Sequence, residues 1–244
     1  MMRIIISGYG KMGKAIESIC RERGHEIIAI LDDEKDWEQL KGVSPENTVV
    51  IDFSMPAVAV GNLLKSFRLG LNVVTGTTGW YDQLDEIKSN CLKNKTALLY
   101  SPNFSLGVNV LFYVNKMLAR VMSKVEGYRV HIDETHHIHK LDAPSGTAIR
   151  LAEDVLKENK NLKRWTKNES GNANELPVLS FREGEVPGIH EIVYKSEADM
   201  LMLRHEAKSR KGFALGAVLA AEFLNGKQGI FTMEDYLRTL GMDV

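Results

Sequence analysis

The sequence has little cysteine and no excess of charge of either sign. Its two cysteines, Cys20 and Cys91, lie in separate stretches of helical periodicity, so we expect reduced, buried thiols rather than a disulfide framework. The 31 Lys and Arg residues against 32 Asp and Glu residues give a formal net charge of -1. This balance offers no cationic face, and it argues against a nucleic acid as partner.

Long hydrophobic runs, internal repeats and low-complexity segments are also missing. No apolar run approaches the roughly 20 residues that a membrane span needs. The first residues, Met1-Met2-Arg3, lead straight into a short apolar stretch without a small-residue cleavage site, so we expect no signal peptide. These absences predict a cytoplasmic protein with no membrane partner. The 244 residues, 44% of them hydrophobic, suffice for one large domain or two modest ones with a real core.

The chain opens with a glycine-rich turn between a strand pattern and a helix pattern. Residues 3–7 form a continuous apolar run typical of a buried parallel strand, and residues 14–23 have helical spacing. Between them stands Gly8-Tyr-Gly-Lys-Met-Gly13, and a second strand pattern over 27–31 ends in Asp32-Asp33. This order of strand, glycine-rich turn, helix, strand and acid is that of dinucleotide-binding βαβ units.

The residue types of this turn each have a physical reason in such a site. Gly8 allows the tight turn, Gly10 lets the backbone approach a pyrophosphate, and Gly13 lets the helix pack close to the strand. Asp32 can accept hydrogen bonds from ribose hydroxyls. A glycine-rich turn that serves packing alone is the alternative. We predict a dinucleotide site made of Gly8, Tyr9, Gly10, Lys11, Met12, Gly13 and Asp32.

The acidic pair Asp32-Asp33 bears on the choice between NADH and NADPH. A 2′-phosphate is bound by Arg or Lys at this point, and two carboxylates would repel it. Lys35 could compensate for that repulsion. We therefore expect NADH or NADPH as cofactor and favour NADH.

Three further strand patterns alternate with helix patterns up to residue 105. The strands are expected over 49–54, 72–75 and 97–100, and the helices over 57–69 and 81–94. Five such alternations predict a Rossmann-like, doubly wound parallel sheet of the α/β class. Gly76-Thr-Thr-Gly79 follows the fourth strand, at the sheet edge where ligands bind, although a plain turn is equally compatible with these residues.

The pattern changes after residue 105. A long apolar helix pattern over 106–122 precedes strand patterns, a helix over 147–159 and a loop-like polar segment over 160–176. The later predicted elements are strands 178–182, 189–195 and 200–207 and helices 212–224 and 235–240. We predict a smaller α+β domain with an open mixed sheet, residues 105–211, inserted between residues 1–104 and 212–244 of the dinucleotide-binding domain. The exposed face of such a sheet needs cover, which a second subunit would provide.

One stretch of the smaller domain concentrates residues that move protons. Glu134-Thr-His-His-Ile-His-Lys-Leu-Asp-Ala-Pro-Ser-Gly-Thr-Ala148 places three histidines and a lysine within five residues, and its Pro-Ser-Gly-Thr turn opens into a helix. His titrates near neutrality, Lys supplies a cation, and a helix N-terminus presents N–H groups to an anion. We expect this stretch to be the active site for an anionic ligand.

Other interpretations of this stretch are weaker. Zinc is not expected, because His136 and His137 on a strand would point to opposite faces and no carboxylate or cysteine stands at a matching spacing. Ser145 lacks the Gly-x-Ser-x-Gly elbow of hydrolases. His190 is expected to be structural, although it could reach the site. A nucleotide-sensing module without turnover is an alternative function, but it has no use for clustered proton donors; another amino-acid dehydrogenase is a third possibility.

The stretch Glu134–Ala148 closely resembles the signature of the dihydrodipicolinate reductase family, which reduces 4-hydroxy-tetrahydrodipicolinate in bacterial lysine and diaminopimelate biosynthesis. The likeness covers most of the chain in the family's order. It includes the Gly8–Gly13 turn, Gly76-Thr-Thr-Gly79, Ser101-Pro-Asn-Phe-Ser-x-Gly-Val-Asn109, Arg182-x-Gly-x-x-x-Gly188-x-His190 and the stretch from His205 to Val218. The chain departs from the family in a short link after the second strand and in Asp33, where many relatives carry Arg; the latter weakens the case for NADPH.

The resemblance implies roles by position. His136 matches the family's proton donor or acceptor, and Lys140 matches its second proton donor. His137 matches a substrate contact, and a substrate carboxylate would be cradled by Ser145, Gly146 and Thr147. The nicotinamide side would be lined by Gly76, Thr77, Thr78, Ser101, Pro102, Asn103 and Phe104.

The resemblance also implies a reaction and an assembly. Hydride would pass from NAD(P)H to C4 of the ring imine of a small dicarboxylate after loss of water. The family is usually a homotetramer built through the sheet of the smaller domain. Because the predicted cofactor and proton-donor residues fall in different domains, we expect closure about linkers near Ser105 and Lys211.

Overall fold

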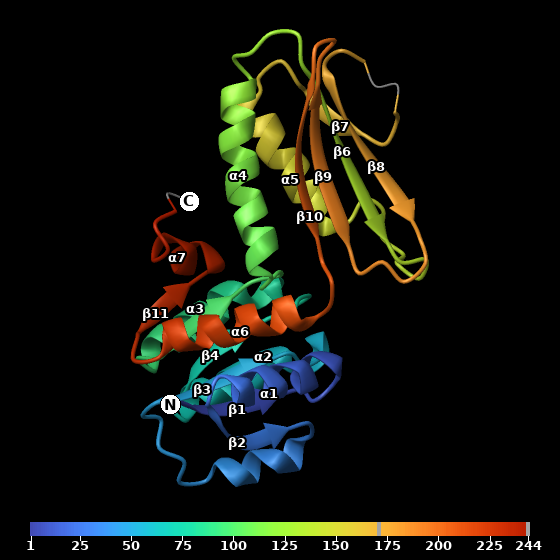
Figure 1. Cartoon of the computed structure of the whole chain (residues 1–244). Coiled ribbons are helices and arrows are strands. Elements are labelled where there is room, and N and C mark those ends of the chain that lie inside the picture. The colour runs from blue at the N-terminus through green and yellow to red at the C-terminus, as the bar shows by residue number, and fades with distance from the viewer. Residues whose placement is uncertain (170–171, 243–244) are drawn as a thin grey trace. The chain divides into compact units, whose positions relative to one another are not determined.

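The computed structural model describes residues 1–169 and 172–242. The chain forms two compact units (Figure 1). The first unit comprises Met1–Leu106 and Arg210–Val244, and the second comprises Gly107–Ser209. The second unit is therefore an insertion in the sequence of the first.

The first unit is built on a six-stranded sheet in the order β11-β5-β4-β3-β1-β2. Every pair of neighbouring strands is parallel. The strands are β1 (Arg3–Ser7), β2 (Glu26–Leu31), β3 (Thr48–Asp52), β4 (Asn72–Thr75), β5 (Ala97–Tyr100) and β11 (Gly229–Phe231). Along β1, β3, β4 and β5 the continuous apolar runs seen in the sequence are buried on both faces, and the predicted Rossmann-like parallel sheet is confirmed.

Helices cover both faces of this sheet. They are α1 (Lys11–Glu22), α2 (Pro56–Arg68), α3 (Leu84–Lys93), α6 (Lys211–Leu224) and α7 (Met233–Arg238), with short 3-10 helices η1 (Glu34–Leu40) and η2 (Tyr81–Gln83). One apolar cluster joins the sheet to α1, α6 and α7, and a second joins it to α2 and α3. Cys20 lies in the first cluster and Cys91 in the second, and both are buried free thiols, as predicted.

The strand order creates a switch point between β1 and β3. The chain runs from β1 to β2 on one side and then crosses to β3 on the other side. In open α/β sheets, ligands bind outside the carboxyl ends of the strands at such a point. The turns that follow β1, β4 and β5 therefore meet at the edge where a ligand is expected.

Two elements of the first unit were not predicted. β11 is only three residues long, too short to show a periodicity, and it exists because it pairs with β5. The polar link after Asp33 forms η1, which is closed by a capping box between Asp33 and Asp36. α7 also begins two residues before the predicted 235, because Thr232 and Asp235 form another capping box.

The second unit carries a five-stranded mixed sheet in the order β10-β9-β6-β8-β7. The strands are β6 (Arg129–His136), β7 (Arg164–Thr166), β8 (Glu175–Arg182), β9 (Ile189–Lys195) and β10 (Met200–Glu206). β8 runs parallel to β6 and β7, whereas β9 runs antiparallel to β6 and β10. The predicted open mixed sheet is confirmed.

Helices α4 (Leu106–Met122) and α5 (Gly146–Glu158) pack on one face of this sheet, within a single apolar cluster (Figure 1). The segment 160–176, predicted to be loop-like, is not loop throughout, because β7 lies within it and β8 begins at Glu175; residues 170–171 of that segment lie outside the described residues. Over the described parts of the chain, we find no helix with the length and hydropathy to cross a membrane.

Candidate functional site

The glycine-rich turn after β1 uses its three glycines for different purposes. Gly8 has a φ of +87°, and a Cβ there would lie 2.5 Å from the carbonyl oxygen of Phe53. A Cβ at Gly13 would lie 2.2 Å from the carbonyl oxygen of Gly8. A Cβ at Gly10 would meet no atom within 4 Å. Packing therefore requires Gly8 and Gly13, while the open side of Gly10 is available to a ligand.

The N-terminus of α1 is suited to a phosphate. Its N-cap residue, Gly10, makes no side-chain capping bond, and the first turn contains no acidic residue. The N–H groups of that turn therefore retain the capacity to bind an anion. Of the other predicted residues, Lys11 is exposed, Met12 packs against the core of the unit, and Tyr9 donates its hydroxyl to Glu17.

Asp32 lies beside this turn. Its Oδ1 accepts the N–H of Tyr9 at 2.9 Å. Asp33 is engaged differently, because its side chain caps η1 and accepts the N–H of Lys35 at 2.7 Å. Of the two acids that end β2, Asp32 alone is directed to the glycine turn through a hydrogen bond.

The remaining predicted cofactor residues follow β4 and β5. Gly76 stands against the Phe53 ring, where a Cβ would come within 2.2 Å. Thr77 is buried, whereas Thr78 and Pro102 are exposed. The turn after β5 is closed on itself by a hydrogen bond of 2.8 Å from Ser101 Oγ to the Asn103 carbonyl, and Phe104 is buried. All of these turns follow the carboxyl ends of parallel strands and so lie at one edge of the first unit's sheet.

A buried carboxylate, Asp52, fastens that edge. It has no exposed surface, and it accepts hydroxyl hydrogen bonds from Ser7 at 2.8 Å, Thr75 at 3.0 Å and Thr77 at 2.8 Å. The three strand-end residues Ser7, Asp52 and Thr75 are direct register partners on β1, β3 and β4. The sequence interpretation missed Asp52, because the register that aligns these residues is not visible in one chain segment.

In the second unit, the predicted catalytic stretch begins at the end of β6. Alternation along this strand places Ile132, Glu134 and His136 on the face that α5 covers, and all three are buried. His137 follows the end of the strand and is half-buried. His139 is 70% exposed at its side chain and lies 3.5 Å from a Glu185 carboxylate oxygen, so it stays outside the buried group.

Glu134 is at the centre of the buried polar group. Its Oε2 lies 3.4 Å from His136 Nδ1 and 3.8 Å from His190 Nε2. Its Oε1 accepts the N–H of Ser145 at 2.9 Å and the hydroxyl of Ser180 at 2.7 Å. The sequence suggested a structural His190 that could reach the site, and the structure places it in this group, opposite Glu134 in the register of β6 and β9.

The charges of this group follow from burial and contact. Burial opposes ionisation of Glu134, yet hydrogen bonds from Ser145 and Ser180 and the nearby His136 lower the pKa of this carboxyl. Burial lowers the pKa of His136, and the Glu134 charge acts against that shift. Burial lowers the pKa of His190 to about 4, so this imidazole is neutral at neutral pH. The group thus combines a carboxylate with two imidazoles.

Lys140 and Arg182 border the group. Lys140 Nζ contacts both carboxylate oxygens of Asp142, at 2.7 and 2.9 Å. Arg182 donates from Nε to the Lys140 carbonyl at 3.2 Å and from an Nη to the Asp142 carbonyl at 2.5 Å. Arg182 thereby holds the backbone of the loop that carries Lys140. Both cations lie close enough to His136 to lower its pKa.

The residues of the predicted carboxylate cradle lie at the first turn of α5. Ser145 is the N-cap, and its Oγ accepts the N–H of Ala148 at 3.2 Å. Since Glu134 takes the N–H of Ser145, the donors without an intrahelical acceptor are the backbone N–H groups of Gly146 and Thr147. These two residues are not fully buried, so an anion can approach them.

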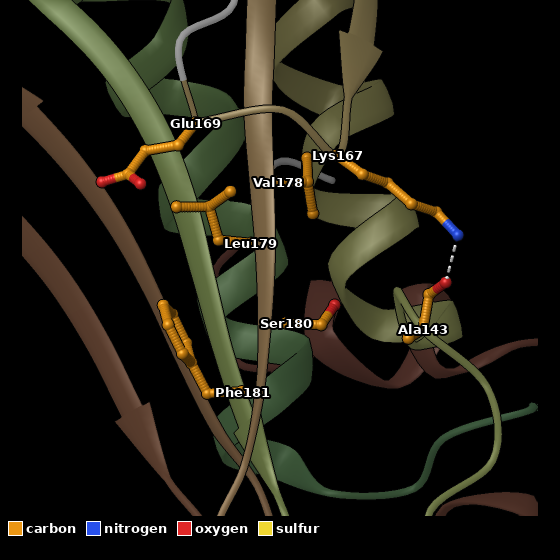
Figure 2. A pocket seen from close by; sticks show the side chains of 7 residues that line it. All are labelled: Ala143, Lys167, Glu169, Val178, Leu179, Ser180 and Phe181. Atoms are coloured by element: carbon orange, nitrogen blue, oxygen red, sulfur yellow. Dashed lines mark hydrogen bonds between the residues drawn. The ribbon is translucent and has the colours of Figure 1, made fainter.

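A hollow of about 460 Å³ lies beside β8 in the same unit. β7 pairs with β8 only as far as Pro177, and the hollow is lined by the residues beyond that point. Figure 2 shows Leu179 and Phe181 pointing to one side of β8 and Ser180 to the other. Lys167 closes one wall by donating to the Ala143 carbonyl at 2.6 Å. None of the predicted catalytic or substrate residues lines this hollow.

Glu134, His136 and His190 each bring one potential ligand atom within 4.8 Å of the others. The sequence argument against zinc overlooked this carboxylate, which stands two residues before His136 on the same face of β6. The i, i+2 spacing of Glu134 and His136 was the signal that could have revealed the pair. That the protein uses no metal stays a prediction.

Comparison with known proteins agrees with this architecture. Family models for the N-terminus and the C-terminus of dihydrodipicolinate reductase match residues 2–104 and 107–237. The 4-hydroxy-tetrahydrodipicolinate reductase of Christiangramia forsetii is 47% identical over 98% of this chain and 99% of its own length. That of Caldanaerobacter subterraneus is 37% identical over the same shares.

A solved structure shares the fold. Dipicolinate-bound dihydrodipicolinate reductase from Paenisporosarcina sp. TG-14 superimposes with a TM-score of 0.75 at 22% identity, covering 95% of this chain and 97% of the other. The two matching family models together span nearly all of the sequence. The chain is an oxidoreductase that belongs to the dihydrodipicolinate reductase family.

Proposed function

We propose that this protein reduces the cyclic imine 4-hydroxy-tetrahydrodipicolinate to tetrahydrodipicolinate, in lysine and diaminopimelate biosynthesis, with His136 and Lys140 as proton donors. The observation that carries the proposal is a single carboxylate, Glu134, that contacts both the His136 imidazole and the N-terminus of α5. Through it, an imidazole that can exchange a proton and a site for an anion are held in one place. Membership of the family supplies the reaction class.

The substrate is a small dicarboxylate, and the second unit offers cations and N–H donors to it. One carboxylate would bind the N–H groups of Gly146 and Thr147, where the positive end of the helix dipole favours an anion. His137 would contact the substrate beside His136. The Lys140 ammonium is paired with Asp142, and a substrate carboxylate would compete for it.

Reduction of a conjugated imine requires a proton as well as a hydride. When bound, NAD(P)H supplies the hydride to ring C4. The negative charge that develops on the ring needs a positioned proton donor, a role that suits His136 or Lys140. The same arrangement excludes bulk water from His136, whose imidazole is buried.

The first unit would hold the dinucleotide. The pyrophosphate would bind the N–H groups at the start of α1, along the open side of Gly10 and beside Tyr9, Lys11 and Met12, with Gly8 and Gly13 setting the turn. Asp32 would accept the ribose hydroxyls. Thr77, Thr78 and Pro102 would line the nicotinamide side, in turns that also contain Gly76, Ser101, Asn103 and Phe104. The acidic pair Asp32-Asp33 favours NADH over NADPH.

The open face of the second unit's sheet is the proposed contact between subunits of a homotetramer. Phe181, Met200 and Met202 are exposed on the face opposite α4 and α5. Apolar side chains gathered on a sheet face mark a surface that another chain covers. The enzyme would act in the cytoplasm, where its free thiols stay reduced.

Steady-state rates with freshly generated cyclic imine test the proposal. NADH should be oxidised only when the imine is present, and kcat/KM should be higher with NADH than with NADPH. Binding of NADH without oxidation would fit a sensing module instead. Activity on an amino acid or a semialdehyde, and none on the imine, would indicate another dehydrogenase.

Dialysis against EDTA tests the prediction that the protein uses no metal. The rate should stay unchanged, and a loss of rate that zinc restores would contradict that prediction.

Replacing Asp32 by alanine should raise the Kd for NADH about tenfold. A hydrogen bond to a charged acceptor contributes roughly 1.5–3 kcal/mol, and each 1.4 kcal/mol is about a factor of ten. Titration of NADH fluorescence measures the effect. Asp33→Ala is the matched control, because it removes a carboxylate that caps η1; it should cost about 1 kcal/mol of stability with a smaller effect on NADH. An unchanged Kd in Asp32→Ala would mean that the ribose binds elsewhere.

A further inference from the structure

The buried carboxylate of Glu134 is shared by two parts of the second unit that the proposed function needs. Glu134 has no exposed surface and lies in the middle strand of the sheet, between β8 and β9. Ser180 and His190 are its direct register partners on those strands, and His205 lies opposite His190 on β10. A row of polar residues therefore crosses four strands at the level of Glu134, on the face that α5 covers.

One oxygen of this carboxylate is fully engaged. Oε1 accepts the Ser145 N–H at 2.9 Å and the Ser180 hydroxyl at 2.7 Å, and an Nη of Arg182 stands 3.9 Å away. The Ser145 N–H is the last backbone donor before α5 begins. Oε1 therefore fixes the start of the helix whose next two N–H groups form the proposed carboxylate cradle.

The other oxygen faces imidazoles. Oε2 of Glu134 and Nδ1 of His136 are both buried, and neither has a hydrogen-bond partner within the described chain, although they lie only 3.4 Å apart. Leaving two buried polar atoms unpaired is unfavourable, so the two atoms are expected to pair with each other. A shift of about 0.5 Å would bring the two atoms to ordinary hydrogen-bond distance.

His190 is the other candidate for Oε2, but Ser145 competes for it. Ser145 Oγ accepts the Ala148 N–H, and it lies 3.3 Å from His190 Nε2. The serine hydroxyl is therefore placed to donate its own proton to that nitrogen, and an Nε2 that accepts cannot donate to Glu134. Oε2 is left to His136.

We propose that Glu134 is a positioning residue: Oε2 accepts the Nδ1–H of His136, while Oε1 holds the N-terminus of α5. The inference rests on the proposed function for its catalytic meaning. With Nδ1–H held by Glu134, Nε2 is the nitrogen of His136 that takes up a proton to form the imidazolium and then delivers that proton to a ligand, while Nδ1 keeps its own. Gly188 leaves space at that end of the ring, because a Cβ there would come within 3.1 Å of Nε2.

The Glu134→Gln variant distinguishes the roles of the two carboxylate oxygens. The amide oxygen should take the Oε1 position, which receives two donors, and the amide NH₂ should then face His136 Nδ1. That donor would force the opposite tautomer, with the proton on Nε2. We expect kcat to fall about 10–100-fold, as for other partners that orient a functional histidine, with KM for the imine and Kd for NADH little changed.

The tautomer of His136 can be determined without measuring enzymatic activity. In the ligand-free wild type, long-range ¹H–¹⁵N NMR of the imidazoles should show His136 protonated at Nδ1, and in Glu134→Gln at Nε2; the signal is assigned by its absence in His136→Gln. Asp133→Asn is the matched control, because it makes the same change of group one residue away on the opposite face of β6. It should alter neither the tautomer nor kcat.

Two outcomes would overturn the inference. One is an Nε2-protonated His136 in the wild type, a result that does not require the Glu134→Gln variant to fold. The other is a Glu134→Gln variant with an unchanged tautomer and a turnover within about twofold of wild type. Failure of the wild type to oxidise NADH with the imine would overturn the proposed function instead, and the NMR result would still decide the role of Glu134.

Discussion

Replacement of His136 by glutamine is expected to lower kcat by roughly two to four orders of magnitude, the usual contribution of a positioned general acid. Glutamine fills a similar volume and can hydrogen-bond, but it cannot deliver a proton near neutral pH. The Kd for NADH should stay unchanged, because the proposed dinucleotide residues all belong to the first unit. Stopped-flow single turnovers together with NADH fluorescence titration measure the two quantities separately.

His139→Gln is the control for that variant. His139 is three residues further along the same loop, but its side chain is 70% exposed and lies outside the buried group. Its replacement should leave kcat close to the wild-type value. Near-normal turnover in His136→Gln would remove His136 from the mechanism, and a comparable loss in both variants would point to damage of the loop rather than to lost chemistry.

The paired variants Gly10→Ala and Gly13→Ala should both bind NADH more weakly, but for different reasons. At Gly10 an added methyl group meets no protein atom within 4 Å, and the local φ of -76° suits alanine. The folded protein should therefore keep its melting temperature. The methyl group would occupy the path of the pyrophosphate, so we expect the Kd for NADH to rise on the order of 100-fold, which is ~2.7 kcal/mol.

At Gly13 the methyl group would lie 2.2 Å from the Gly8 carbonyl oxygen. This overlap forces α1 away from β1, and overpacking of this kind costs about 1–3 kcal/mol or more. The melting temperature should fall, and NADH binding should weaken as a consequence. Thermal unfolding and NADH titration on both variants provide the comparison. A stable Gly10→Ala variant that binds NADH normally would place the pyrophosphate away from this turn.

Local patterns in the sequence were sufficient to predict the first five strands of the parallel sheet and the helix that follows Ser145. Continuous apolar runs and capping residues are short-range signals, and the elements formed close to where these signals stand. β11 escaped prediction because its three residues become a strand only by pairing with β5. The 3-10 helix after Asp33 was not predicted because the segment Glu34–Leu40 shows no apolar periodicity, although a capping box starts it.

Prediction of the site was limited in the same way, to residues that lie close together in the sequence. The histidines, Lys140 and the N-cap serine stand in one continuous stretch, so the sequence alone could single them out as candidates. Glu134 is in the same stretch, yet its importance depends on Ser180 and His190, which reach it through the register of β8 and β9. Asp52 gathers its three hydroxyls in the same way, across β1 and β4. Such pairings are set by tertiary structure, so no local sequence pattern predicts them.

The alignment of Ser180, Glu134 and His190 at one level of the sheet has a consequence for protein engineering. Chimeric enzymes assembled from two relatives would have to exchange residues 129–148 and 175–206 as one block. A junction between these segments would unite an acceptor from one parent with donors from another, and a slip of a single residue would turn Ser180 or His190 to the wrong side. The connection from β8 to β9 belongs to the same block, because the Glu183 N–H donates to the His136 carbonyl and the Ile138 N–H donates to the Gly184 carbonyl.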